Sequence, residues 1–306
     1  MSKRDFLQLS DLTLAEARRV LDVARTLKAE PRGARTSLLA GQSVAIVLEK
    51  ASTRTRVSFE VGAAHLGMHP VVLGVQGSQL GRGEPIRDTA RVLARYCDVI
   101  VFRTSTTERL REMATATVPV VNALSDDGHP LQVLCDVLTI EEQLGSPIAG
   151  KRLAFVGDTS SNMARSWIEA APMFDFHLVL AGPRAYAPPQ AEMARATGHV
   201  TLVPHPEQAA DGCDVINTDV WTSMGQEADG DERSDAFAGW TVNQAMVARA
   251  KPGVIVLHCL PAHRGEEIDD DVIEGPRSRV WDQAENRLHV QKALLVWLLG
   301  AADRVK

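Results

Sequence analysis

The chain has 306 residues, of which 45% are hydrophobic and 24% charged, and its formal net charge is -6 at pH 7. This is the composition of a folded globular protein, and the length suits two domains of about 150 residues each. The negative charge argues against nucleic acid or an anionic membrane as a partner. Residues 1–12 lack the apolar core of a signal peptide, and the four cysteines form no C-x-x-C pair, so we expect a cytoplasmic protein.

Strands and helices alternate through the first half of the chain. Thr13 and Glu16 form a capping box that opens an amphipathic helix. An apolar run from Ser43 leads through a polar loop into a second helix, which is expected to close at Gly67. Three further strands and three further helices are predicted in this half: strands 71–73, 98–102 and 118–124, and helices beginning at Pro85, over 107–113 and over 129–144. Such alternation implies a parallel sheet covered on both faces.

A second series of strands follows the glycine- and proline-rich segment 145–150, which we predict to be a hinge. Residues 222–239 are rich in glycine and acidic residues, and we expect a long irregular loop of functional importance. The predicted strands of this half are 153–156, 178–180, 200–203, 214–217 and 254–257. The predicted fold class is α/β, with two parallel-sheet domains, 1–145 and 150–283, a cleft between them, and a C-terminal helix, 284–306, packing back on the first domain.

The polar segment Ser52-Thr53-Arg54-Thr55-Arg56 directly follows a strand and opens a helix. A helix N-terminus offers free N–H groups and partial positive charge, so an anion fits there. Hydroxyls and arginine forks make phosphate the leading candidate. A solvated polar turn is the alternative that composition alone leaves open.

Other polar groups also follow predicted strands, namely Arg103, His129, Asp219 and Cys259. In open parallel sheets ligands bind outside the carboxyl ends of the strands, so these groups are expected to converge. Taken singly, Arg103 also fits a solvated strand end and His129 a structural helix cap.

Two cofactor interpretations are disfavoured. Residues 157–163 lie between a strand and a helix but lack the G-x-G-x-x-G pattern of dinucleotide sites. His258, Cys259 and His263 suggest a metal, yet their spacing is not that of zinc sites and the sequence offers no evident further ligand. An inert buried cysteine is the stronger alternative for Cys259.

Several of these segments resemble motifs of the aspartate and ornithine carbamoyltransferases. Residues 52–56 resemble the family's carbamoyl phosphate signature, 129–132 its His-Pro-x-Gln segment, and 283–287 its Gln-Ala-Glu-Asn-Arg segment. The resemblance implies a set of residues that contact carbamoyl phosphate: Ser52, Thr53, Arg54, Thr55, Gln79, Arg103, His129, Gln132, Cys259, Leu260 and Arg287.

The resemblance narrows to the ornithine carbamoyltransferases at 219–225, which is similar to their Asp-x-x-x-Ser-Met-Gly segment and has no counterpart in the aspartate enzymes. Residues 157–163 resemble their Gly-Asp-x-x-Asn-Asn-Met turn, with Ser161 in place of the first asparagine, and 258–261 match His-Cys-Leu-Pro. The resemblance makes Cys259 a contact to the side-chain amine and implies four ornithine-binding residues: Asn162, Asp219, Ser223 and Met224.

The implied reaction is carbamoyl transfer from carbamoyl phosphate to the δ-amine of L-ornithine, a step of arginine biosynthesis or the urea cycle. Its implied catalytic residues are Arg103, His129, Asp219 and Cys259, and it requires no metal or organic cofactor. The segment carrying Gln79 resembles one that reaches a neighbouring subunit, so a homotrimer with shared sites is expected. Two alternatives stay open: a carbamoyltransferase for N-acetylornithine, N-succinylornithine or putrescine, and a catalytically silent relative that binds anions or partners.

Overall fold

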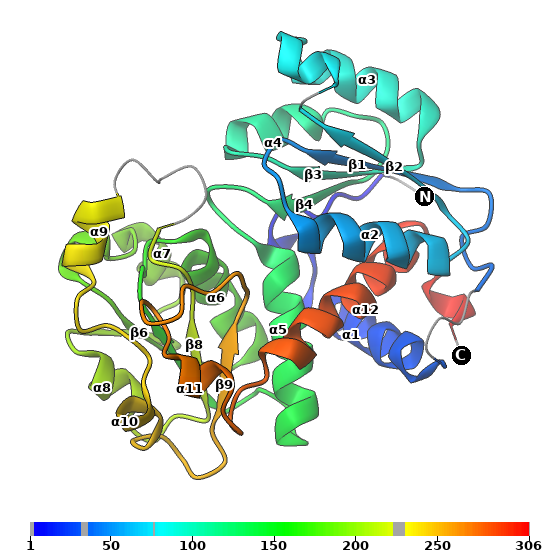
Figure 1. Cartoon of the computed structure of the whole chain (residues 1–306). Helices are drawn as coiled ribbons and strands as arrows, with labels where there is room; N and C mark the ends of the chain where they lie inside the picture. Colours follow the sequence, from blue (N-terminus) through cyan, green and yellow to red (C-terminus); the bar gives the residue numbers. More distant parts are fainter. Residues whose placement is uncertain (1–2, 32–35, 76, 223–229, 306) are drawn as a thin grey trace. The chain divides into compact units, whose positions relative to one another are not determined.

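The computed structural model describes residues 3–31, 36–75, 77–222 and 230–305 (Figure 1). The chain divides into two compact units, Met1–Leu134 with Glu285–Lys306, and Cys135–Ala284. Each unit contains one sheet of parallel strands flanked by helices, which confirms the predicted α/β class with two parallel sheets. Among the described residues, none of the helices is long and apolar enough to cross a membrane.

The first unit holds a four-stranded sheet of order β2-β1-β3-β4. Phe6 adds an isolated parallel bridge to Val121, so the N-terminal segment lies along β4. The strands are β1 (Ser43–Leu48), β2 (His69–Gly74), β3 (Val99–Arg103) and β4 (Val120–Leu124), and the helices are α1 (Leu14–Ala29), α2 (Thr53–His65), α3 (Ile86–Tyr96) and α4 (Thr107–Met113), with 3₁₀ turns η1 (Leu9–Asp11), η2 (Gln79–Arg82) and η5 (Ala302–Arg304).

Alternation along the strands of this sheet supplies two apolar faces. Ala45 and Val47 of β1 and Phe102 of β3 share a buried cluster with apolar residues of α3 and α4. Side chains at alternate positions of a strand point to opposite faces, so the intervening residues face the other side, where α2 contacts β1 and β2. Figure 1 shows α3 and α2 on opposite sides of this sheet.

The second unit holds a five-stranded sheet of order β7-β6-β5-β8-β9. Its buried cluster joins Ala154 and Val156 of β5 to apolar side chains of the short helices that cover this face. The strands are β5 (Arg152–Val156), β6 (His177–Ala181), β7 (Val200–Val203), β8 (Val215–Thr218) and β9 (Ile255–His258), and the helices are α6 (Asn162–Phe174), α7 (Gln190–Arg195), α8 (Pro206–Ala210), α9 (Gly230–Ala236), α10 (Gln244–Val247) and α11 (Asp270–Ile273), with the 3₁₀ turn η3 (Arg184–Tyr186).

Two long helices run from one unit into the other. The boundary falls between Leu134 and Cys135 within α5 (Pro130–Leu144), and between Ala284 and Glu285 within α12 (Val280–Leu298). The predicted domain limits and the roles assigned to the two domains stay predictions.

The predicted start of α1 and the predicted end of α2 are confirmed. The capping box of Thr13 and Glu16 is present, and Gly67 follows α2 with φ of 81°. β4 begins at Val120 rather than 118, because Pro119 has no N–H to donate to a neighbouring strand. Pro85 is the N-cap of α3 rather than its first residue. The stretch 222–239 is not wholly irregular, since it contains α9.

The strand order also locates a topological switch point in each sheet. The chain leaves β1 toward β2 on one side and returns to β3 on the other, and it does the same from β5 to β6 and then β8. Loops that diverge at such a switch point leave a crevice at the carboxyl ends of the strands. The segments that follow β1, β3, β5 and β8 are therefore the first places to look for ligand-binding groups.

Candidate active site

In the first unit, hydroxyl groups organise the turn after β1. Ser52 is the N-cap of α2, and its Oγ accepts a hydrogen bond from the Thr55 N–H at 3.4 Å. The Ser52 hydroxyl also donates to Thr55 Oγ1 at 3.0 Å. Thr53 is exposed and Arg54 half-buried in the first turn of α2. This segment thus presents hydroxyls and a guanidinium at a helix N-terminus, as predicted for an anion site.

Arg287 of α12 connects this turn to α5. Its guanidinium is buried and donates to Thr55 Oγ1 at 3.0 Å and to Gln132 Oε1. Arg287 and Thr55 are 232 positions apart. The Arg287 Nε is buried and has no hydrogen-bond acceptor within the part of the chain that the structure describes. The structure therefore brings together three of the residues predicted for carbamoyl phosphate.

His129 lies next to this cluster. It is buried immediately before α5, and its carbonyl accepts hydrogen bonds from the N–H groups of Gln132 and Val133. Burial, and then the positive charges of Arg287 and Arg103, lower the pKa of His129 well below its ordinary value. The imidazole is therefore neutral near pH 7, and Arg103, the buried last residue of β3, lies close enough to act on it electrostatically.

Gln79 begins the 3₁₀ turn η2 and is exposed. Among the described residues, Gln79 forms no hydrogen bond with the side chains of the cluster around Arg287. Its assignment to a neighbouring subunit stays a prediction.

In the second unit, Asp219 and Cys259 form a polar pair at the ends of β8 and β9. Cys259 Sγ donates to Asp219 Oδ1 at 3.0 Å, and the same oxygen accepts from the Val220 N–H at 2.8 Å. Burial raises the pKa of Asp219, although His258 and the hydrogen bond from Cys259 act in the opposite direction. Cys259 is half-buried, so the alternative of a fully buried inert cysteine does not describe it.

Glu267, which no sequence motif indicates, holds the segment that carries Cys259. The Leu260 N–H donates to His258 Nδ1 at 2.9 Å, so that nitrogen is unprotonated and Nε2–H donates to Glu267 Oε1 at 2.8 Å. The His263 N–H donates to the same carboxylate oxygen at 2.7 Å. Leu260 has a φ of 60°, a backbone conformation that residues with a Cβ atom rarely adopt. These contacts hold the residues on either side of Cys259 in place.

The structure adds a candidate metal ligand that the sequence did not indicate. Asp219 supplies a third candidate ligand, since its oxygen, a His258 nitrogen and the Cys259 sulfur lie within 4.8 Å of one another. Both ring nitrogens of His258 already have protein partners, and the thiol donates to Asp219. The cluster is organised by hydrogen bonds between its members and their neighbours.

Asn162 is the first residue of α6, and Ser161 is its N-cap, with Oγ accepting from the Ala164 N–H at 3.2 Å. The serine that replaces the first asparagine of the motif therefore has a capping role of its own. Asn162 lies where helix N–H groups favour a carboxylate. Ser223 and Met224 lie outside the described residues.

Arg233 of α9 is a second residue that sequence reasoning missed. Its Nε donates to the Trp221 carbonyl at 2.6 Å, and its guanidinium pairs with Asp158 and lies 4.6 Å from the centre of the Tyr186 ring. Asp158 also accepts from the Ser160 N–H at 2.9 Å. Arg233 thus ties the chain just after Asp219 to the turn that precedes Asn162.

Both halves of the chain match models of known protein families. The family model for the carbamoyl-P binding domain of aspartate/ornithine carbamoyltransferase matches residues 4–142, and that for the Asp/Orn binding domain matches 149–298. The ornithine carbamoyltransferase of Sorangium cellulosum is 68% identical over 98% of this chain and 99% of its own length.

Solved structures agree as well. The ornithine carbamoyltransferase of Pyrococcus furiosus has a TM-score of 0.91 at 46% identity, covering 98% of both chains. The anabolic ornithine carbamoyltransferase of Campylobacter jejuni has a TM-score of 0.90 at 35% identity, covering 96% of this chain and 98% of its own. With both halves of the sequence matched and the identity extending over nearly the whole length, the chain belongs to the aspartate/ornithine carbamoyltransferase family.

Proposed function

We propose that this protein transfers the carbamoyl group of carbamoyl phosphate to the δ-amine of L-ornithine, giving L-citrulline and phosphate. The observation that favours ornithine over aspartate is the buried carboxylate of Asp219 beside the Cys259 thiol. A buried anionic group suits an ammonium and disfavours a second substrate carboxylate. The relatives described above are ornithine carbamoyltransferases that match this chain over nearly its full length, and they support the same choice.

Carbamoyl phosphate is assigned to the first unit. Ser52, Thr53, Arg54 and Thr55 would hold the phosphate at the start of α2, together with Arg103. Arg103, His129 and Thr55 would polarise the carbonyl oxygen. A neutral imidazole suits that role because it can act as a hydrogen-bond donor to a carbonyl. Three further residues complete the assignment: Gln132 and Arg287 of the same cluster, and Gln79 from a neighbouring subunit.

Ornithine is assigned to the second unit. Asn162 at the start of α6 would bind the α-carboxylate, and Asp219 the α-ammonium, with Ser223 and Met224 contributing from the segment that follows. Cys259 would contact the side-chain amine, and the Leu260 backbone the carbamoyl amide.

Catalysis of this reaction requires mainly that the two substrates be positioned and that the developing charge be stabilised. Carbamoyl phosphate is a mixed anhydride whose phosphate is already a good leaving group. The δ-amine, with an ordinary pKa of about 10.4 by analogy with lysine, must lose a proton before it attacks the carbonyl carbon. The C–N bond then forms, the tetrahedral intermediate collapses with cleavage of the C–O bond to phosphate, and the departing phosphate takes up the remaining proton.

The test is a comparison of acceptor amines with the purified protein. Ornithine should give a kcat/KM at least about a hundredfold above those for N-acetylornithine, N-succinylornithine and putrescine. A preference for one of these amines would reassign the substrate. Absence of transfer to every amine would favour a silent anion-binding relative.

We also propose that the protein acts in arginine biosynthesis, that it is located in the cytoplasm, and that it forms a homotrimer or a multiple of trimers with shared sites. No metal or organic cofactor is assigned to the reaction.

A further inference from the structure

A largely buried carboxylate lies near the proposed phosphate site of the first unit, three residues before Ser52. Glu49 follows β1 directly, and its side chain is 9% exposed. Its N–H donates to the Arg103 carbonyl at 2.9 Å. Three residues span at most about 11 Å, so the backbones of Glu49 and Ser52 lie within little more than one Debye length of each other at physiological ionic strength. A negative charge at this position acts against the binding of a phosphate unless it is compensated.

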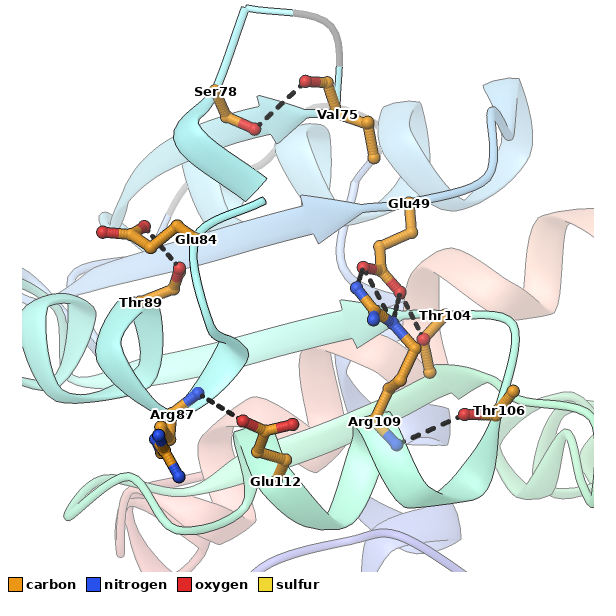
Figure 2. A network of polar contacts seen from close by, with 10 residues as sticks. All are labelled: Glu49, Val75, Ser78, Glu84, Arg87, Thr89, Thr104, Thr106, Arg109 and Glu112. Carbon is orange, nitrogen blue, oxygen red and sulfur yellow. Dashed lines mark hydrogen bonds and ion pairs between the residues drawn. The ribbon is translucent and has the colours of Figure 1, made fainter. Parts of the chain in front are cut away.

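Two groups hold the Glu49 carboxylate, as Figure 2 shows. Arg109 of α4 donates from Nε to the two oxygens at 3.2 and 3.0 Å, and from Nη2 to Oε1. The buried Thr104, which directly follows Arg103, donates its hydroxyl to Oε2. Glu49 in turn raises the pKa of Arg109, chiefly through these hydrogen bonds.

The helix that carries Arg109 is itself fixed near this carboxylate. Thr106 is the N-cap of α4, and its hydroxyl accepts from the Arg109 N–H at 3.3 Å. At the other end of the same helix, Glu112 accepts from the Arg87 N–H at 3.1 Å. Arg109 therefore reaches Glu49 from an anchored backbone.

We propose that Arg109 is a positioning residue for carbamoyl transfer, which neutralises Glu49 beside the phosphate site and, through Glu49 and Thr104, holds Arg103 in place. This inference rests on the proposed role of residues 52–55 and Arg103 in binding carbamoyl phosphate. Without Arg109, the Glu49 carboxylate would repel the phosphate dianion, and Arg103 would lose part of its support.

The test compares Arg109→Met, Glu49→Gln, the double variant and Arg109→Lys. Arg111→Met is the control, because Arg111 lies on the same helix with a 69% exposed side chain and only a 4.0 Å pair to Glu108. Arg109→Met should raise the KM for carbamoyl phosphate about tenfold while the KM for ornithine changes less than about twofold. Arg111→Met should change neither KM.

The double variant separates charge compensation from a merely structural role. Adding Glu49→Gln to Arg109→Met should return the KM for carbamoyl phosphate to within about threefold of wild type, because the repelling charge is gone. A structural role predicts a double variant at least as impaired as Arg109→Met, and that result would overturn the proposal. If Arg109→Met does not fold, Arg109→Lys should stay within about threefold of wild type and Glu49→Gln alone should not raise the KM; a rise in either would contradict the proposal.

Calorimetric titration of inorganic phosphate into the same variants gives a readout that does not depend on the reaction. Weaker phosphate binding by Arg109→Met, restored in the double variant, supports the proposal whichever amine is the acceptor. Equal phosphate affinity of wild type and Arg109→Met would contradict it. A protein that binds phosphate in this pattern but forms no citrulline would refute the proposed function and leave the role of Arg109 intact.

Discussion

Cys259 donates a hydrogen bond from Sγ to Asp219 Oδ1 at 3.0 Å, although the two residues are 40 positions apart. The contact follows from strand pairing. Thr218, the last residue of β8, lies opposite His258, the last residue of β9, in a parallel register. The residue that follows each of these strands therefore emerges at the same end of the sheet, which brings the Cys259 thiol next to the Asp219 carboxyl group.

Replacement of Cys259 by serine tests the amine side of the site. The hydroxyl is smaller and changes the contact to the δ-amine, so kcat/KM for ornithine should fall about tenfold or more while the KM for carbamoyl phosphate changes less than about twofold. Steady-state kinetics with each substrate varied in turn gives both values. The control is Cys97→Ser, which changes another cysteine to serine in the first unit. Full activity of Cys259→Ser across pH would identify the thiol as an inert group.

Asp219→Asn should make the protein more stable and less active. Because burial raises the pKa of Asp219 above its ordinary value, the folded state holds the proton more tightly than the unfolded chain, and ionisation costs stability above the raised pKa. The amide Oδ1 can still accept from Cys259 and Val220. We expect a higher Tm for Asp219→Asn than for wild type at pH 7, and the difference should shrink as the pH falls through the pKa of Asp219. The KM for ornithine should rise at least about tenfold. A lower Tm at every pH, or an unchanged KM, would contradict this account.

His129 should make the fold sensitive to mild acid. Its pKa is lowered in the folded protein, so the unfolded chain binds the proton more readily once the pH drops below about 6.5. The contribution is complete above that pH and is lost as the pH falls toward the lower folded pKa. Urea unfolding of wild type and His129→Gln from pH 7.5 to 5 should show a steeper loss for wild type. Parallel curves would mean that His129 is not buried in its neutral form.

Much of the framework was accessible from sequence because its signals are local. Alternating strands and helices predicted the two parallel sheets, and cap residues such as Thr13 and Gly67 marked helix ends. The carboxyl-end rule for parallel strands also indicated which loops would carry polar groups.

The contacts that were missed join segments far apart in sequence. Glu49 and Arg109 are separated by 60 positions, and Arg233 and Asp158 by 75. In the sequence each of these residues is an ordinary charged residue, because no periodicity or spacing links it to its partner. Their pairing is visible only in the folded chain. For Arg287, the motif predicted a role in binding, but only tertiary structure shows that it reaches Thr55 and Gln132.

Sharing of sites between subunits can be measured by complementation. Arg54→Ala and Gln79→Ala, each expected to be nearly inactive, would be dissociated and reassociated in equal amounts. If Gln79 acts in a neighbouring subunit, about a quarter of the sites in mixed trimers would combine an intact Arg54 with an intact neighbouring Gln79. Activity should recover to about that fraction of wild type. With mixed trimers verified by native mass spectrometry, no recovery would place Gln79 in its own subunit or outside the site.

The most direct measurement of the central claim follows the carbamoyl carbon itself. Carbamoyl phosphate labelled at its carbonyl carbon would be incubated with the purified protein and L-ornithine, and the products followed by carbon NMR. The account predicts that the label moves to the ureido carbon of citrulline, with one phosphate released for each citrulline formed and no transfer in the absence of ornithine. Label that appears only in bicarbonate and carbamate, at the same rate with and without ornithine, would contradict it.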